Sequence, residues 1–182
     1  VLGCIVAVCN TAVGGTCMTE EGAIAQSAPG YYWNNPNGDL WRDSLTALNG
    51  FAPDGRVEFA CFMQGGSDAT GAVDGTIFEN DYYEFISRLR GTLTNKDGSS
   101  LFLILSSLGR TNYSTDENRQ AIREALRRVS ESDTLIEQVP VYNLPTSDGT
   151  HPTDSGDAEL GRTLAQIGTG ATAPKLTDIN LD

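Results

Sequence analysis

The chain has 182 residues, of which 39% are hydrophobic and 20% charged, as expected of one globular domain with a full core. Its formal net charge is −12 at pH 7, which argues against nucleic acid or an anionic membrane surface as a partner. No stretch approaches the roughly 20 consecutive apolar residues that span a bilayer.

Four apolar runs of strand length recur along the chain, at residues 3–10, 56–64, 100–108 and 135–144. Three of them are nearly continuous in apolar residues, which is typical of strands in a sheet covered on both faces. The first run lacks a basic segment and a small-residue cleavage site, so we interpret it as a buried strand and not as a signal peptide.

Apolar residues at helical spacing predict four amphipathic helices between and after these runs, over 40–48, from about Glu79 to 93, over 122–129 and over 160–167. The third should open with a capping box formed by Ser114 and Glu117. Alternating strands and helices predict a mostly parallel sheet in a three-layer α/β/α sandwich. We expect one domain over residues 1–170 and a tail over 171–182, where the periodicity ends.

The chain has four cysteines, Cys4, Cys9, Cys17 and Cys61, and one histidine, His151. No two cysteines have the C-x-x-C spacing, so a Cys/His zinc site is not predicted. We expect mostly buried thiols that behave as small hydrophobic side chains, and we expect no metal and no cofactor.

Open parallel sheets bind ligands at the carboxyl ends of their strands, so the residues that follow the predicted strands are candidates for a site. Gly14 and Gly15 follow the first run. Adjacent glycines expose backbone N–H groups that could donate to a developing oxyanion, although a Gly-Gly pair also serves as a simple turn.

The second cluster is Gln64-Gly65-Gly66-Ser67, where Gln64 offers an amide donor at a strand end. A competing interpretation makes Ser67 a nucleophile, because its surroundings nearly match a nucleophile elbow of an α/β-hydrolase. An elbow opens directly into a helix, whereas residues 68–76 are predicted to separate Ser67 from the next helix.

The third cluster is Asp148-Gly149-Thr150-His151-Pro152. A carboxylate three residues before an imidazole can accept its Nδ1–H and leave Nε2 free as a base. The alternative is an ordinary Asp-Gly turn at the entry to a helix. The spacing alone leaves both interpretations open.

The motifs "VGGT", "QGGSDA" and "DGTHPT", in this order, resemble the SGNH-hydrolase superfamily and most closely its sialate O-acetylesterase and acetylxylan esterase branch. The resemblance implies a flavodoxin-like α/β/α fold and a serine esterase that removes acetyl groups from sugars without a metal. It implies that His151 is the general base and Asp148 its orienting acid. It also implies oxyanion donors at Gly14 or Gly15 and at Gln64.

Two features depart from that branch. Gly66 stands where a glutamate is typical, and no Gly-Asp-Ser or Gly-x-Ser-Asn block occurs in the sequence. We therefore expect these residues to be the C-terminal part of a longer chain, whose preceding segment supplies the first strand and the nucleophilic serine. A gap inside the sheet would leave unpaired backbone groups at a cost of about 1–3 kcal/mol each.

Two alternatives to the esterase remain: a non-catalytic glycan-binding domain, of the kind found on phage tail fibres or spikes, and an α/β-hydrolase that uses Ser67. For glycan binding, the aromatic stretch Tyr31 to Trp41 could stack on sugars, although Trp41 fits a helix core better. The expected partners are an acetylated carbohydrate, the preceding segment of the same protein and, in a homo-oligomer, a second copy of the chain. A secreted or virion-associated setting is favoured, and the acyl group and sugar stay open.

Overall fold

The computed structural model of the chain describes residues 8–109, 112–139, 141 and 144–168. The helices and strands are α1 (Glu20–Ala25), α2 (Asp39–Phe51), β1 (Arg56–Val57), β2 (Ala60–Phe62), α3 (Gly66–Thr70), α4 (Gly75–Thr92), β3 (Thr94–Asn95), β4 (Leu103–Ser106), α5 (Asp116–Glu131), β5 (Ile136–Val139) and α6 (Asp154–Gly168). Within these residues, no helix has both the length and the apolar character needed to cross a membrane.

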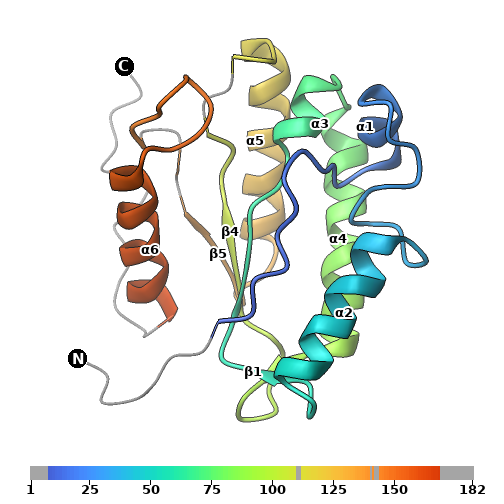
Figure 1. The fold of residues 1–182 in the computed structure, drawn as a ribbon, viewed down its shortest axis with the longest axis vertical. Helices are drawn as coiled ribbons and strands as arrows, with labels where there is room; N and C mark the ends of the chain where they lie inside the picture. Colours follow the sequence, from blue (N-terminus) through green and yellow to red (C-terminus); the bar gives the residue numbers. More distant parts are fainter. Residues whose placement is uncertain (1–7, 110–111, 140, 142–143, 169–182) are drawn as a thin grey trace.

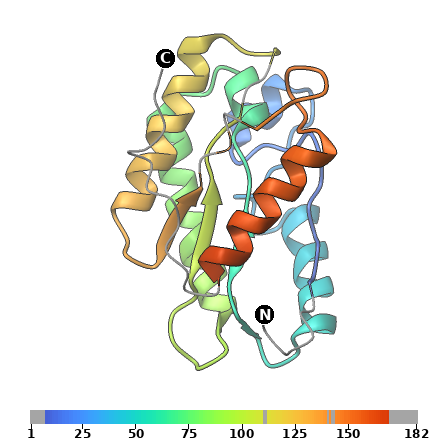
Figure 2. The same cartoon turned by 90° about the vertical axis from the view of Figure 1, so that its left-hand side faces the viewer.

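The main sheet is parallel and has the strand order β2-β4-β5. On one face Leu103 and Leu105 of β4 pack with residues of α2, α4 and α5, and on the other Ile104 packs with residues of α6. Helix α6 lies on one side of the sheet and the other long helices on the opposite side (Figure 1), as the turned view also shows (Figure 2). The predicted three-layer α/β/α sandwich is thus confirmed.

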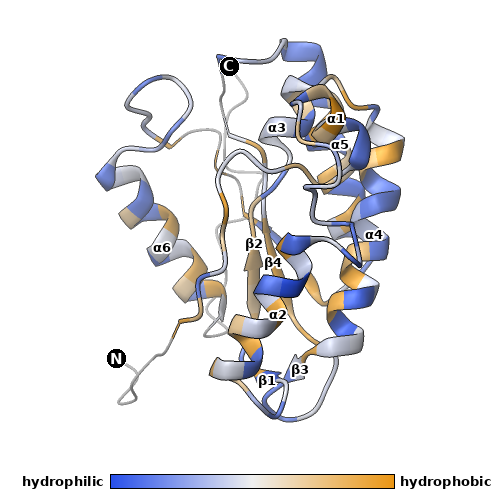
Figure 3. Ribbon diagram, turned by 45° about the vertical axis from the view of Figure 1, so that its right-hand side comes forward, coloured by the Kyte–Doolittle hydropathy of each residue, from blue (hydrophilic) through white to orange (hydrophobic). Residues whose placement is uncertain are grey.

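The larger of the two cores has an aromatic centre. Phe62 of β2 lies 4.6 Å from the ring of Phe85 on α4 and 5.1 Å from that of Trp33. Trp41 is only 7% exposed and packs edge-on against Phe85, which confirms its placement in the core. The apolar stripes of α2 and α4 turn inward accordingly (Figure 3).

The predicted strand over 56–64 is two strands in two sheets. Arg56 and Val57 pair with β3, whereas β2 pairs with β4, so the chain changes partner at residues 58 and 59. Helices α1 and α3 have six and five residues, too few to show a helical period in the sequence, and were not predicted.

Helix ends also differ from the prediction. Helix α4 begins at Gly75 and not near Glu79, because Asp74 caps it by accepting from Thr76 N. Helix α5 is capped by Thr115, whose hydroxyl accepts from Asn118 N at 3.2 Å, so the capping box at Ser114 is wrong by one residue.

Two predicted segments lie outside what the structure describes. The tail over 171–182 is one, and the greater part of the run 3–10 is the other; its described residues 8–10 belong to no strand. Cys4 falls in that run as well.

The remaining thiols, Cys9, Cys17 and Cys61, are free. Cys17 is buried, which raises the pKa of its thiol to about 12. Cys61 was expected to be buried and is exposed, because it lies on β2, an outer strand of the described sheet, and lines a pocket there.

Candidate active site

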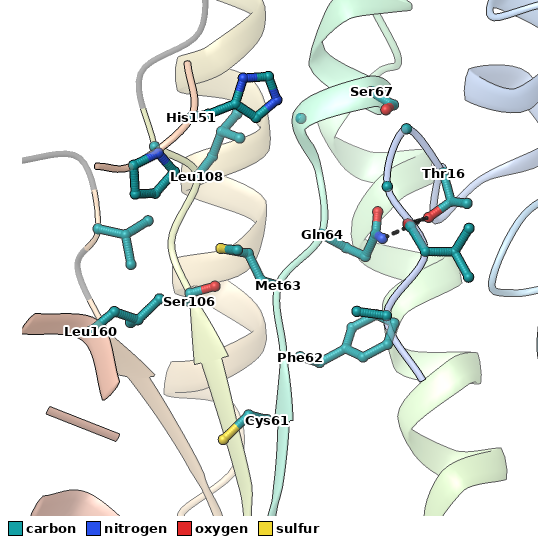
Figure 4. A pocket seen from close by; sticks show the side chains of 18 of the residues that line it. Thr16, Cys61, Phe62, Met63, Gln64, Ser67, Ser106, Leu108, His151 and Leu160 are labelled. Atoms are coloured by element: carbon teal, nitrogen blue, oxygen red, sulfur yellow. Dashed lines mark hydrogen bonds between the residues drawn. The ribbon is translucent and has the colours of Figure 1, made fainter. Parts of the chain in front are cut away.

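A pocket of about 780 Å³ opens at the carboxyl ends of β2 and β4. Its walls come from residues 9–16, from the turn between β2 and α3, from the loop after β4 and from the loop before α6 (Figure 4). All three clusters expected from the sequence contribute to it: Gly14 and Gly15, Gln64, and His151. Chain topology thus brings together groups that are up to 137 residues apart in sequence numbering, from Gly14 to His151.

The loop before α6 is closed by backbone hydrogen bonds. Ser147 N donates to His151 O at 2.9 Å, and Thr153 N donates to Pro145 O at 2.8 Å. The Thr153 hydroxyl then accepts from Gly156 N at 3.3 Å in the first turn of α6. The closed loop holds His151 where it lines the pocket.

The two carboxylate oxygens of Asp148 have different tasks. Oδ1 accepts from the backbone N–H of Thr150 at 2.9 Å and of His151 at 2.7 Å, which forms the turn. Oδ2 lies 2.7 Å from His151 Nδ1. The sequence left a turn and an Asp–His pair as alternatives. The structure has both, because one oxygen of the carboxylate forms the turn and the other contacts the imidazole.

This arrangement determines the protonation of the pair. A carboxylate only accepts, so the hydrogen bond places the proton of neutral His151 on Nδ1 and leaves Nε2 as the basic nitrogen. The backbone N–H of His151, its imidazole and the N–H of Thr150 lower the pKa of Asp148 to about 2. Asp148 is thus ionised at neutral pH and can only accept from the imidazole.

Asn112, which the sequence analysis missed, fastens this loop from outside. Its side-chain amide donates to Asp148 O at 2.9 Å, and its backbone N–H donates to the Thr150 hydroxyl at 3.2 Å. Gly149 makes the approach possible, because its φ is +81° and a Cβ there would lie 2.2 Å from Asn112 Nδ2. A single Asn 36 residues before Asp148 carries no local signal.

Gln64 lies in a network with Thr16 and Trp33. As drawn in Figure 4, Gln64 Nε2 faces the Thr16 hydroxyl at 3.0 Å. Turning the amide by 180° lets Nε2 donate to Thr16 O at 2.9 Å, while the oxygen accepts from Trp33 Nε1 at 2.9 Å. Only the turned orientation pairs each donor with an acceptor, so we adopt it.

The segment that carries Gly14 and Gly15 is anchored just after these glycines by Asp68 of α3. The carboxylate of Asp68 is fully buried and accepts from Met18 N at 2.9 Å, Thr19 N at 3.1 Å and the Thr19 hydroxyl at 2.8 Å. Burial raises its pKa, and the three hydrogen bonds oppose that rise. Both glycines themselves are exposed at the pocket.

The setting of Ser67 differs from the expectation. Helix α3 starts at Gly66, directly after a Gly65 with φ of +119°, so no long segment separates this serine from a helix. Ser67 lies on the Thr16 side of Gln64, whereas His151 lies on the opposite side (Figure 4). Its hydroxyl interacts with the thiol of Cys17.

Two of the four aromatic residues proposed for sugar stacking are buried. Trp33 and Trp41 are 3% and 7% exposed, whereas Tyr31 is exposed and Tyr32 is partly exposed. Tyr113, which was not singled out in the sequence, is 67% exposed and lines the pocket. Within the described residues, no group of three or more His, Cys, Asp or Glu side chains is placed to hold a metal ion.

Comparisons with known proteins agree with this architecture. A family model described as carbohydrate esterase, sialic acid-specific acetylesterase, matches residues 3–169. The crystal structure of a protein from Arabidopsis thaliana is similar in fold, with a TM-score of 0.59 and 21% sequence identity. That match covers 74% of this chain and 53% of the Arabidopsis protein, so the chain spans about half its length. None of the curated proteins matches.

Proposed function

The chain belongs to the carbohydrate esterase family of sialic acid-specific acetylesterases, and on that premise we propose that it forms the base and oxyanion half of a serine-dependent carbohydrate O-acetylesterase. The observation that carries the proposal is the 2.7 Å pair of Asp148 and His151 beside the pocket that the Gln64 amide also lines. An oriented imidazole and an amide donor are the two protein groups that acyl transfer needs in addition to a nucleophile.

The proposed reaction has two steps. His151 Nε2 removes the proton from a serine hydroxyl as its oxygen attacks the acetyl carbonyl, and the carboxylate of Asp148 stabilises the resulting imidazolium. Collapse of the tetrahedral intermediate breaks the ester bond, and His151 returns the proton to the departing sugar oxygen. Water, deprotonated by His151, then attacks the acetyl-serine. Collapse of this second intermediate breaks the bond between the acetyl carbon and the serine oxygen, His151 returns the proton to that oxygen, and the acid is released and ionises to acetate.

The negative charge of each tetrahedral intermediate lies on the former carbonyl oxygen. We assign its stabilisation to a backbone N–H of Gly14 or Gly15 and to an amide N–H of Gln64, which line the same pocket. An amide nitrogen has two hydrogens, so Gln64 can donate to Thr16 O and to the oxyanion together.

The serine is proposed to come from another part of the protein, seated along the pocket. Its wall includes Cys61 and Met63 of the β2 segment, and Met63 is 57% exposed. The buried hydroxyl of Ser106 on β4 also lines it and has no hydrogen-bond partner among the described residues. A polypeptide segment placed here would cover the apolar side chains and could pair with that hydroxyl.

The test is acetate release from an acetylated sugar and from p-nitrophenyl acetate by the full-length protein. His151→Ala should abolish turnover, and Ser67→Ala should leave most of it. Turnover that survives His151→Ala refutes the esterase mechanism, and turnover lost in Ser67→Ala favours the α/β-hydrolase alternative.

A second candidate, glycan binding without catalysis, is favoured by the exposed ring of Tyr113 at the pocket. Calorimetric titration of the full-length protein with an acetylated oligosaccharide, combined with an acetate assay, separates the two functions. Binding without acetate release would support this candidate.

A further inference from the structure

We propose that Trp33 is a positioning residue that fixes the orientation of the Gln64 amide, so that its N–H and not its C=O faces the reacting carbonyl. The inference rests on the proposed esterase function. It goes beyond that function by assigning a task to a buried side chain that contacts no reacting atom.

The argument begins with what an indole can do. Trp33 Nε1 is a donor only, and it lies 2.9 Å from the oxygen of the turned Gln64 amide and 2.9 Å from the Thr16 hydroxyl. In the opposite orientation, the Gln64 nitrogen would face the indole N–H, and the Gln64 oxygen would face the carbonyl of Thr16. The two donors would then face each other, and so would the two acceptors, which is unfavourable.

Thr16 completes the selection. Its hydroxyl donates to the turned amide oxygen of Gln64 at 3.0 Å, and its own carbonyl accepts from Gln64 Nε2 at 2.9 Å. The same contacts thus connect Gln64 to the residue that follows Gly15. The single indole N–H therefore helps to fix both the orientation of the Gln64 amide and the position of the segment that carries Gly14 and Gly15.

The indole itself is held from several sides. It is 3% exposed and packs edge-on against Phe62 and Phe85, with centroids at 5.1 Å and 6.3 Å. The backbone N–H of Trp33 donates to Cys17 O at 2.9 Å. The guanidinium of Arg88 donates to the backbone oxygen of the next residue, Asn34, also at 2.9 Å. A donor anchored in this way can hold a mobile amide in one of two nearly isosteric orientations.

The orientation matters because the two ends of an amide have opposite polarity. An N–H directed at the oxyanion stabilises it, whereas a carbonyl oxygen in the same place repels it. A Trp33 variant without the N–H should populate both orientations and lose part of the stabilisation in the transition state. Binding of the uncharged ester should change little.

The first experiment is a double-mutant cycle on full-length protein with p-nitrophenyl acetate. Gln64→Ala should lower kcat about 100-fold or more, the usual effect of removing an oxyanion donor. Trp33→Phe should lower kcat about tenfold with KM nearly unchanged, and it should have no further effect in the Gln64→Ala background. Trp41→Phe, in the same aromatic core, is the matched control and should keep wild-type kcat.

The second measurement needs no activity. In NMR spectra, the side-chain amide proton of Gln64 that donates to Thr16 O should exchange slowly with solvent, and Trp33→Phe but not Trp41→Phe should accelerate the exchange. If Trp33→Phe fails to fold, benzothienylalanine at position 33 keeps the bicyclic ring and removes only the N–H.

The outcomes separate two failures. A wild-type protein without esterase activity, or activity that survives His151→Ala, refutes the proposed function and the inference with it. An active, His151-dependent enzyme in which the Trp33 and Gln64 effects are additive, or in which Gln64 amide exchange does not respond, overturns the role of Trp33 alone.

Discussion

Removing the buried carboxylate of Asp68 should destabilise the protein strongly. The carboxylate accepts three hydrogen bonds, from Met18 N, Thr19 N and the Thr19 hydroxyl, at 2.8–3.1 Å. Asp68→Ala leaves two buried backbone N–H groups without an acceptor, at about 1–3 kcal/mol each. Relief from burying the charge offsets part of that loss, so we expect a net cost of about 3 kcal/mol.

Asp68→Asn keeps the size and one acceptor oxygen, which can still serve Thr19. Its amide nitrogen, however, faces the N–H of Met18, so we expect a smaller loss of about 1–2 kcal/mol. Urea unfolding measures both variants, and a loss of 3 kcal/mol corresponds to a shift in midpoint of about 1–2 M. Asp43→Asn, at an exposed acid on α2, is the control and should change the unfolding free energy by less than about 0.5 kcal/mol.

A loss below about 0.5 kcal/mol in Asp68→Ala would show that the carboxylate does not anchor this segment. A large loss in the control would show that neutralising even an exposed acid destabilises the protein, so that the effect at position 68 could not be assigned to its buried hydrogen bonds. Either result would refute the reasoning.

Three further predictions follow from the same geometry. Gly65→Ala should cost several kcal/mol in a urea melt, because its φ is +119° and a Cβ would lie 2.6 Å from Ile122 Cγ2; an unchanged midpoint would contradict this. Asp148→Asn should lower kcat/KM at least about 100-fold, since the amide can donate to Nδ1 and stabilise the wrong tautomer; the esterase assay checks it, with near wild-type activity as the contrary result. Burial and the nearby acids Glu21 and Glu84 raise the pKa of Asp81 to about 6. The stabilisation from its protonated form is therefore complete below about pH 4 and is lost as the pH rises through 6. Asp81→Asn should accordingly raise the free energy of unfolding by about 1 kcal/mol at pH 7.5, after allowance for solvent screening. It should also flatten the dependence of that free energy on pH between pH 4 and 6.

The sequence predicted the layers of the fold well where burial is continuous. Strand β4 reads as an apolar run because Leu103 and Leu105 face one core and Ile104 the other. The division of 56–64 into β1 and β2 was not predictable, because both parts are strand-like and the change of partner depends on β3, far along the chain.

The candidate site likewise has a part that the sequence predicts and a part that it does not. Asp148 and His151 are three residues apart, so their local pattern is visible in the sequence. Trp33, Asp68 and Asn112 act across 17 to 50 residues of chain, through contacts that exist only after folding. No period or motif marks such residues.

The double use of Asp148 has a consequence for recognising inactive descendants of such an enzyme. One of its oxygens forms the turn, so a descendant that no longer hydrolysed esters would still benefit from an aspartate at this position. The imidazole of His151 is exposed and supports no other part of the loop through its ring in the contacts described for it, so drift would remove it first. A retained aspartate beside a lost histidine is thus the mark we expect of a sequence that keeps the loop and has abandoned the chemistry.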